Sequence, residues 1–166
     1  MLKLVLLLAC PVLSFHWQKM KGKWFELART RNLKLEQGDH VEFHIDPRDA
    51  NNFLLEYFSN TEPKAFHNRA VGVLNEDTGK YQITVTNNFL TRLFTFNVEV
   101  VDTDYTSYAI IHSKTTFFWF YNHVCAWILT RTPKVDANLE NFLVRRVEEK
   151  LGIKKDELYF TEQTPL

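Results

Sequence analysis

The side chains best suited to chemistry in this sequence are two cysteines and a pair of histidines. Cys10 falls within an apolar leader, which leaves Cys125 without a second cysteine for a disulfide. Since unpaired cysteines are usually buried, we expect Cys125 to be a small core residue and not a nucleophile. His40 and His44 are four residues apart with no further ligand nearby, so we predict no metal site.

No other set of residues suggests a reaction. The sequence has no paired base and nucleophile and no glycine-rich phosphate loop, so we predict neither an enzyme nor a cofactor. Lys and Arg number 20 against 20 Asp and Glu, and this balance gives no support for a nucleic-acid partner. The aromatic content is 14%, with 14 Phe in 166 residues, which indicates one domain with a wide apolar interior to line or fill.

The first fourteen residues form a leader. Lys3 precedes about ten apolar residues, too few for a membrane-spanning helix of roughly 20. Val12 and Ser14 suggest cleavage after Ser14, so we predict a signal peptide over 1–14, a secreted domain over 15–166 and Phe15 as the mature N-terminus. In the alternative, residues 7–10 act as a lipobox and the protein is lipid-anchored at Cys10 in a bacterial envelope.

The dominant period along the rest of the chain is two. Apolar and polar residues alternate in 40–46, 80–86 and 93–100, which is typical of strands with one dry face. Further strands are predicted at 22–30, 52–58, 65–74, 105–112 and 122–131. Turn-forming residues separate them at 46–51, 75–79 and 101–104. Eight consecutive strands with short connections predict an all-β, up-and-down antiparallel barrel that could hold one small ligand.

One segment near the C-terminus has helical periodicity. After Asp136, a suitable N-cap, an apolar stripe faces a charged one, and Gly152 can end the helix. The stripe consists of Leu139, Phe142, Leu143, Val147 and Leu151. We therefore expect one C-terminal α-helix packed outside the barrel, followed by a short strand at 157–161.

Gly22-Lys23-Trp24 stands at the start of the first predicted strand, Thr103-Asp104-Tyr105 lies between the sixth and seventh, and Arg131 ends the eighth. These three motifs resemble those of the lipocalin family, nearest its apolipoprotein D, insect bilin-binding and bacterial lipocalin branch. The resemblance covers 22 to about 161. It implies that these residues close one end of the barrel, with the arginine across the tryptophan ring. The disulfide that ties down the tail in many members cannot form here, so the order of the tail is in question.

The opposite end would be the mouth, formed by loops at 31–39, 59–64, 87–92 and 113–121. Phe89, Leu90 and the run from Phe117 to Tyr121 are unusually apolar for loops, and we expect them either to extend strand packing or to rim the mouth and contact ligand or membrane. His44, His67 and Arg69 could meet a polar end of the ligand, although solvent-facing positions are the more ordinary outcome.

The predicted cavity wall follows from the alternation along the strands. On the first strand, Trp24 and then Glu26 and Ala28 are expected to point inward. The side chains predicted to contact the ligand are Glu26, Phe43, Phe53, Leu55, Tyr57, Tyr81, Phe94, Phe96, Trp127 and Leu129. We predict a carrier of a small hydrophobic molecule, such as a fatty acid, lysophospholipid, sterol, retinoid or tetrapyrrole, acting as a monomer or weak dimer. The alternative is an anchored envelope lipoprotein that handles membrane lipids.

Overall fold

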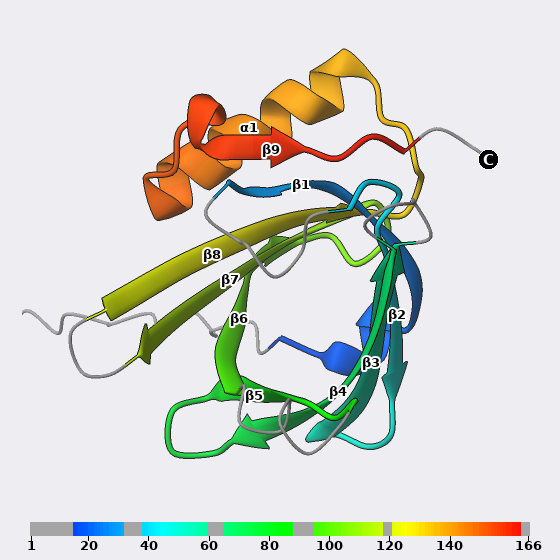
Figure 1. The fold of residues 1–166 in the computed structure, drawn as a ribbon, viewed down its shortest axis with the longest axis vertical. Helices are drawn as coiled ribbons and strands as arrows, with labels where there is room; N and C mark the ends of the chain where they lie inside the picture. Colours follow the sequence, from blue (N-terminus) through cyan, green and yellow to red (C-terminus); the bar gives the residue numbers. More distant parts are fainter. Residues whose placement is uncertain (1–14, 32–37, 60–64, 88–94, 118–120, 164–166) are drawn as a thin grey trace, which may run out of the picture.

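Eight antiparallel strands close into a barrel in the computed structural model, which describes residues 15–31, 38–59, 65–87, 95–117 and 121–163. Each strand pairs with the next along the chain, and the first pairs with both the eighth and the second (Figure 1). The predicted eight-stranded barrel is therefore confirmed. The strands are β1 (Gly22–Thr30), β2 (Glu42–Pro47), β3 (Asn52–Ser59), β4 (Phe66–Asn75), β5 (Lys80–Val85), β6 (Thr95–Thr103), β7 (Tyr108–Phe117) and β8 (Tyr121–Thr130).

Two predicted connections are shorter than expected. β6 continues to Thr103 through a register shift between Val100 and Asp102, so most of the segment 101–104 is strand. β7 runs to Phe117, which pairs with Tyr121 at the start of β8, so the segment 113–121 is mostly a hairpin ladder. This long hairpin projects from the barrel in Figure 1. Its β-branched and aromatic residues favour continued pairing over a loop.

Among the described residues there is one α-helix, α1 (Ala137–Leu151), and it lies outside the barrel as predicted. The Asp136 side chain accepts a hydrogen bond from the Leu139 amide, and Gly152 ends the helix in the left-handed conformation. Leu143, Val144 and Val147 are its buried face, which packs on the outward side chains Ala28, Ile110, Ala126 and Ile128 of β1, β7 and β8. The helix thus forms a second, outer core with this part of the barrel.

The C-terminal tail is ordered through Gln163 without any disulfide. The short strand β9 (Leu158–Phe160) pairs with Ala28–Thr30 at the place where β1 and β2 diverge. Beyond it, the Thr161 amide donates to the Leu27 carbonyl, and the His40 amide donates to the Glu162 carbonyl. The Gln163 amide group donates to the carbonyls of Glu26 and Val41, both at 2.9 Å. Backbone and side-chain hydrogen bonds therefore hold the tail in place between β1 and β2.

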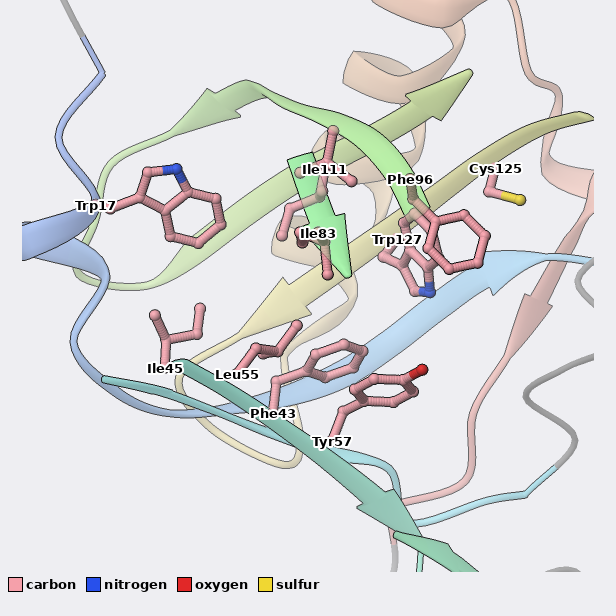
Figure 2. Close-up of a pocket in the computed structure, with 11 residues that line it drawn as sticks. Trp17, Phe43, Ile45, Leu55, Tyr57, Ile83, Phe96, Ile111, Cys125 and Trp127 are labelled. Atoms are coloured by element: carbon pink, nitrogen blue, oxygen red, sulfur yellow. The ribbon is translucent and has the colours of Figure 1, made fainter. Parts of the chain in front are cut away.

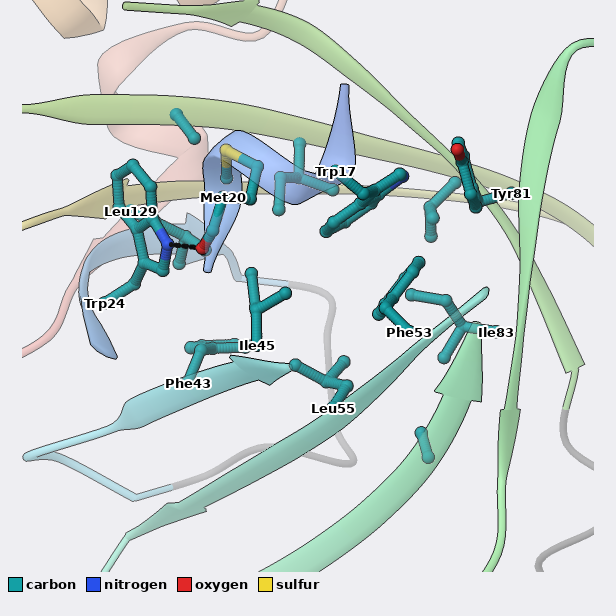
Figure 3. Close-up of a cluster of buried hydrophobic side chains, with 14 of the residues drawn as sticks. Trp17, Met20, Trp24, Phe43, Ile45, Phe53, Leu55, Tyr81, Ile83 and Leu129 are labelled. Carbon is teal, nitrogen blue, oxygen red and sulfur yellow. Dashed lines mark hydrogen bonds between the residues drawn. The ribbon is translucent and has the colours of Figure 1, made fainter. Parts of the chain in front are cut away.

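The segment before β1 contributes to the inner core. Residues Trp17–Met20 form a short 3₁₀ turn (η1), and both Trp17 and Met20 are buried. Trp17 stacks on Phe53 with ring centroids 3.9 Å apart and meets Tyr81 edge-on at 5.3 Å (Figure 3). This segment therefore folds back into the barrel from its closed end.

Candidate ligand cavity

The closed end of the barrel is built on Trp24, which is fully buried. The Arg131 guanidinium lies 3.7 Å from the centre of the indole ring, a cation–π arrangement. Arg131 also donates to the carbonyls of Lys21 at 3.1 Å and Lys23 at 2.9 Å. On the other side, Trp24 Nε1 donates to the Met20 carbonyl at 2.8 Å (Figure 3). Trp24 thus joins β1, η1 and the end of β8 into one floor.

Gly22 is required by this floor because its φ of 104° lies in the region that L side chains rarely adopt. A Cβ at this position would stand 3.4 Å from Arg131 Nη1, which is close to ordinary contact. The glycine-x-tryptophan pattern therefore allows the chain to turn into β1 beneath the guanidinium while Trp24 points into the barrel.

The turn after β6 supports the same floor. Partial burial raises the pKa of the Asp104 carboxyl. Hydrogen bonds from the Ser107 hydroxyl and from the amides of Ser107, Tyr108 and Thr106 outweigh this effect and hold the pKa below its ordinary value. Tyr105 has a positive φ of 65°, and its carbonyl accepts from Arg131 Nη2. The turn is therefore shaped to present a carbonyl to the arginine.

Above the floor lies an apolar cavity that opens to solvent. The space inside it, together with its open mouth, measures about 720 Å³. Figure 2 shows the lining side chains pointing inward from several strands and from η1. They are Trp17, Phe43, Ile45, Leu55, Tyr57, Ile83, Phe96, Val98, Ile111, Cys125 and Trp127.

The structure places half of the predicted wall residues in this lining: Phe43, Leu55, Tyr57, Phe96 and Trp127. Phe53, Tyr81 and Leu129 are buried in the same inner core but do not line the cavity. Phe94 and the predicted rim residues Phe89 and Leu90 lie outside the described residues, as do 118–120.

Glu26 is not in the lining, because its carboxylate is held elsewhere. Its Oε1 accepts hydrogen bonds from Arg29 and from the hydroxyl of Thr161 in the tail, and both charged residues are almost fully buried. Burial raises the pKa of Glu26, opposed by Arg29 and Thr161. Glu26 Oε2 has no hydrogen-bond partner among the described residues. Glu26, which was predicted as a polar residue of the cavity wall, therefore helps to attach the C-terminal tail to β1.

The prediction that Ala28 faces the cavity was wrong. The ladder between β1 and β8 shifts register between Glu26 and Ala28, and one extra residue reverses which side chains point inward. Ala28 consequently packs in the outer core under α1, while Arg29 turns toward the inside of the barrel wall.

Several lining residues were not named from the sequence. Ile45, Ile83 and Val98 share the inward alternation of Phe43, Tyr81 and Phe96, so the strand pattern contained the signal for them. Cys125 was predicted to be buried, and it is 5% exposed, but its place in the lining was not predicted. Trp17 precedes the barrel and belongs to no periodic segment, so only the folded chain reveals its position.

The polar residues considered for a ligand's head group face outward. His44 and His67 flank the ring of Phe58 on the outer face, at 5.2 Å and 5.5 Å. Arg69 pairs with Glu56 at 2.8 Å and is 67% exposed. His44, His67 and Arg69 therefore face solvent, which was the more ordinary expectation for them.

Across 15–31, 38–59, 65–87, 95–117 and 121–163, no three His, Cys, Asp or Glu side chains gather where they could hold a metal ion. Within those same ranges, no helix has the length and apolar character needed to cross a bilayer.

A closed eight-stranded barrel around an apolar cavity defines a protein of the class that can enclose one small hydrophobic molecule. The chain belongs to the lipocalin / cytosolic fatty-acid binding protein family, whose model matches residues 21–164. The membership predicted from the three motifs is confirmed, and it supports binding of a small hydrophobic ligand.

Relatives and solved structures agree with this assignment. Apolipoprotein D of Bos taurus is 26% identical over 157 residues, covering 90% of this chain and 78% of that protein. Apolipoprotein D of Rattus norvegicus is 25% identical over 130 residues, covering 78% and 68%. The crystal structure of lobster apocrustacyanin A1 superposes with a TM-score of 0.72 at 16% identity, covering 89% of this chain and 79% of that one. At that identity, the likeness concerns the fold.

Proposed function

We propose that this protein binds a small hydrophobic molecule in the barrel cavity and carries it through an aqueous compartment. The observation that supports this most directly is the cavity itself, which is lined almost entirely by apolar side chains from several strands and from η1. Moving apolar surface from water into such a space is favourable by about 25 cal/mol per Å². Sterols, retinoids, tetrapyrroles and lipids with long acyl chains are the candidate ligands.

The test is to purify the protein from its native source and measure its mass under non-denaturing conditions. We expect a single bound molecule, which organic extraction then releases for identification. As a parallel measurement, a lipophilic fluorophore should quench emission from Trp17 and Trp127, because both line the cavity. Absence of a co-purifying molecule together with absence of quenching would contradict the proposal.

We also propose that the protein is secreted after removal of residues 1–14. Phe15 supports this, because it stacks on Tyr105 at 5.7 Å and meets Trp17 edge-on at 5.2 Å, so the fold engages the chain from the proposed first residue onward. Mass analysis of the mature protein should find Phe15 first and no acyl chain. A diacylated Cys10 would instead favour the anchored lipoprotein.

A further inference from the structure

The lining of the cavity carries no formal charge among the described residues. Of its eleven side chains, eight are hydrocarbon or thiol, and the remaining three are Trp17, Trp127 and Tyr57, which are neutral. A carboxylate moved from water into such surroundings loses its hydration and gains no counter-ion. That cost is large unless a charged partner with good hydrogen-bond geometry is present.

The buried guanidinium of Arg29 on β1 is already engaged by other groups of the protein. Arg29 stands opposite Trp127 in the β1–β8 ladder, close to the cavity in register. Its guanidinium contacts the Glu26 carboxylate, donates to the Gly38 carbonyl at 3.1 Å and lies 4.7 Å from the ring centre of Tyr159. A ligand carboxylate would have to compete with Glu26 for this group and would leave a second buried acid behind.

The cation at the closed end is separated from the cavity by an aromatic ring. Arg131 lies over one face of Trp24, and its donors are directed at the carbonyls of Lys21, Lys23 and Tyr105. Trp24 itself belongs to the inner core. An anion in the cavity therefore could not reach Arg131 without displacing Trp24 from the floor.

From these three observations we infer that the cavity selects an uncharged lipophilic molecule over an anionic molecule with the same carbon skeleton. This inference rests on the proposed function and narrows its ligand class to neutral compounds such as alcohols, aldehydes, ketones, esters and hydrocarbons.

The experiment compares retinol with retinoate, which share one skeleton and differ in charge. Binding of each is measured by quenching of tryptophan emission at pH 8, where the carboxyl group is ionised. We expect retinol to bind at least about tenfold more tightly than retinoate. Retinoate binding should strengthen as the pH is lowered and the carboxyl becomes neutral, whereas retinol binding should not change over the range in which the protein stays folded.

A matched pair of variants tests whether the lack of a charged side chain in the cavity lining causes the preference for retinol over retinoate. Phe96 lines the cavity and is half-buried, whereas the next residue on β6, Asn97, is exposed on the outer face. Phe96→Lys should narrow or reverse the preference for retinol, and Asn97→Lys, which adds the same charge outside, should leave it unchanged. Equal effects of the two variants would show that the charge of the wall does not set the preference.

The outcomes separate the two proposals. Equal or tighter binding of retinoate by the native protein at pH 8 would overturn the inference of a neutral ligand while leaving the carrier function standing. Failure of both compounds to bind would count against both proposals. The comparison in the native protein decides the inference even if Phe96→Lys does not fold.

Discussion

The ring of Phe53 lies directly over Gly72, its partner on the neighbouring strand β4. A Cβ built on Gly72 would stand 2.1 Å from Phe53 Cζ, far inside van der Waals contact. The ring is fully buried, stacks on Trp17 and lies 5.6 Å from the ring centre of Tyr81. The absence of a side chain at Gly72 therefore sets the position of Phe53, and through it the position of Trp17 in the cavity lining.

Gly72→Ala should destabilise the protein by about 1 to 3 kcal/mol, because overpacking forces buried side chains from their preferred rotamers. Phe53→Leu should also be destabilising alone, but the double variant should be more stable than the sum of the two effects predicts. Chemical unfolding of the four proteins measures this coupling, with Val73→Ala as an exposed control on the same strand. Strict additivity would contradict the assigned contact.

Trp24→Ala should lower the free energy of unfolding by about 3 to 5 kcal/mol, as truncation of large core side chains does. Expression yield should fall with stability, without a selective change in ligand affinity for the protein that does fold. Lys23→Ala, at the exposed neighbouring position, is the control. Native-like melting of Trp24→Ala would show that the floor of the barrel has been misplaced.

Gln163→Ala should loosen the tail, because it removes the donor shared by the carbonyls of Glu26 and Val41. The expected loss is about 0.5 to 1.5 kcal/mol for each hydrogen bond removed, because the Val41 carbonyl still accepts from the Glu26 amide at 3.0 Å. Amide hydrogen exchange should accelerate at His40 and Thr161, whose amides bond within the tail attachment, and remain slow at Gln82 on β5. A uniform change across all three amides would indicate global destabilisation instead.

The alkaline stability of the protein should depend on Tyr108. Its hydroxyl donates to Asp102, and burial together with that carboxylate raises the pKa of Tyr108 from 10.0 to about 12. Because the unfolded tyrosine ionises first, the stability contributed by Tyr108 is complete below pH 10 and is lost as the pH rises toward about 12. The difference in melting temperature between the native protein and Tyr108→Phe should therefore shrink from pH 9 to pH 11.5, and a constant difference would contradict the assignment.

Cys125 offers a chemical report on the cavity. Its thiol is 5% exposed and lines the cavity, so a small maleimide should react with it slowly. Saturating retinol should slow the reaction further by filling the space, whereas the rate for a cysteine introduced at the exposed position Val73, in a Cys125→Ser background, should not change. Labelling of Cys125 that is insensitive to every bound lipid would show that ligands occupy another site.

The barrel and its helix could be predicted because alternation and helical periodicity in this sequence are strong and the three motifs occur in order. Prediction of the cavity wall failed where a strand is locally irregular. The bulge after Glu26, for example, turns the Ala28 side chain to the outer face of the barrel. It also missed groups whose position depends on distant partners. Trp17 enters the lining through its stack on Phe53, and Glu26 leaves it because Thr161, 135 residues away, draws its carboxylate into the tail attachment.

The insertion of the tail between β1 and β2 also has a kinetic consequence. β1 begins the barrel, yet one of its edges is completed by residues 158–163 at the other end of the domain. The hydrogen bonding of β1 therefore cannot be completed until the whole domain has been synthesised. Pairing of such distant segments is slow because a long loop must close first. Docking of the tail against β1 should thus be one of the slow steps of folding.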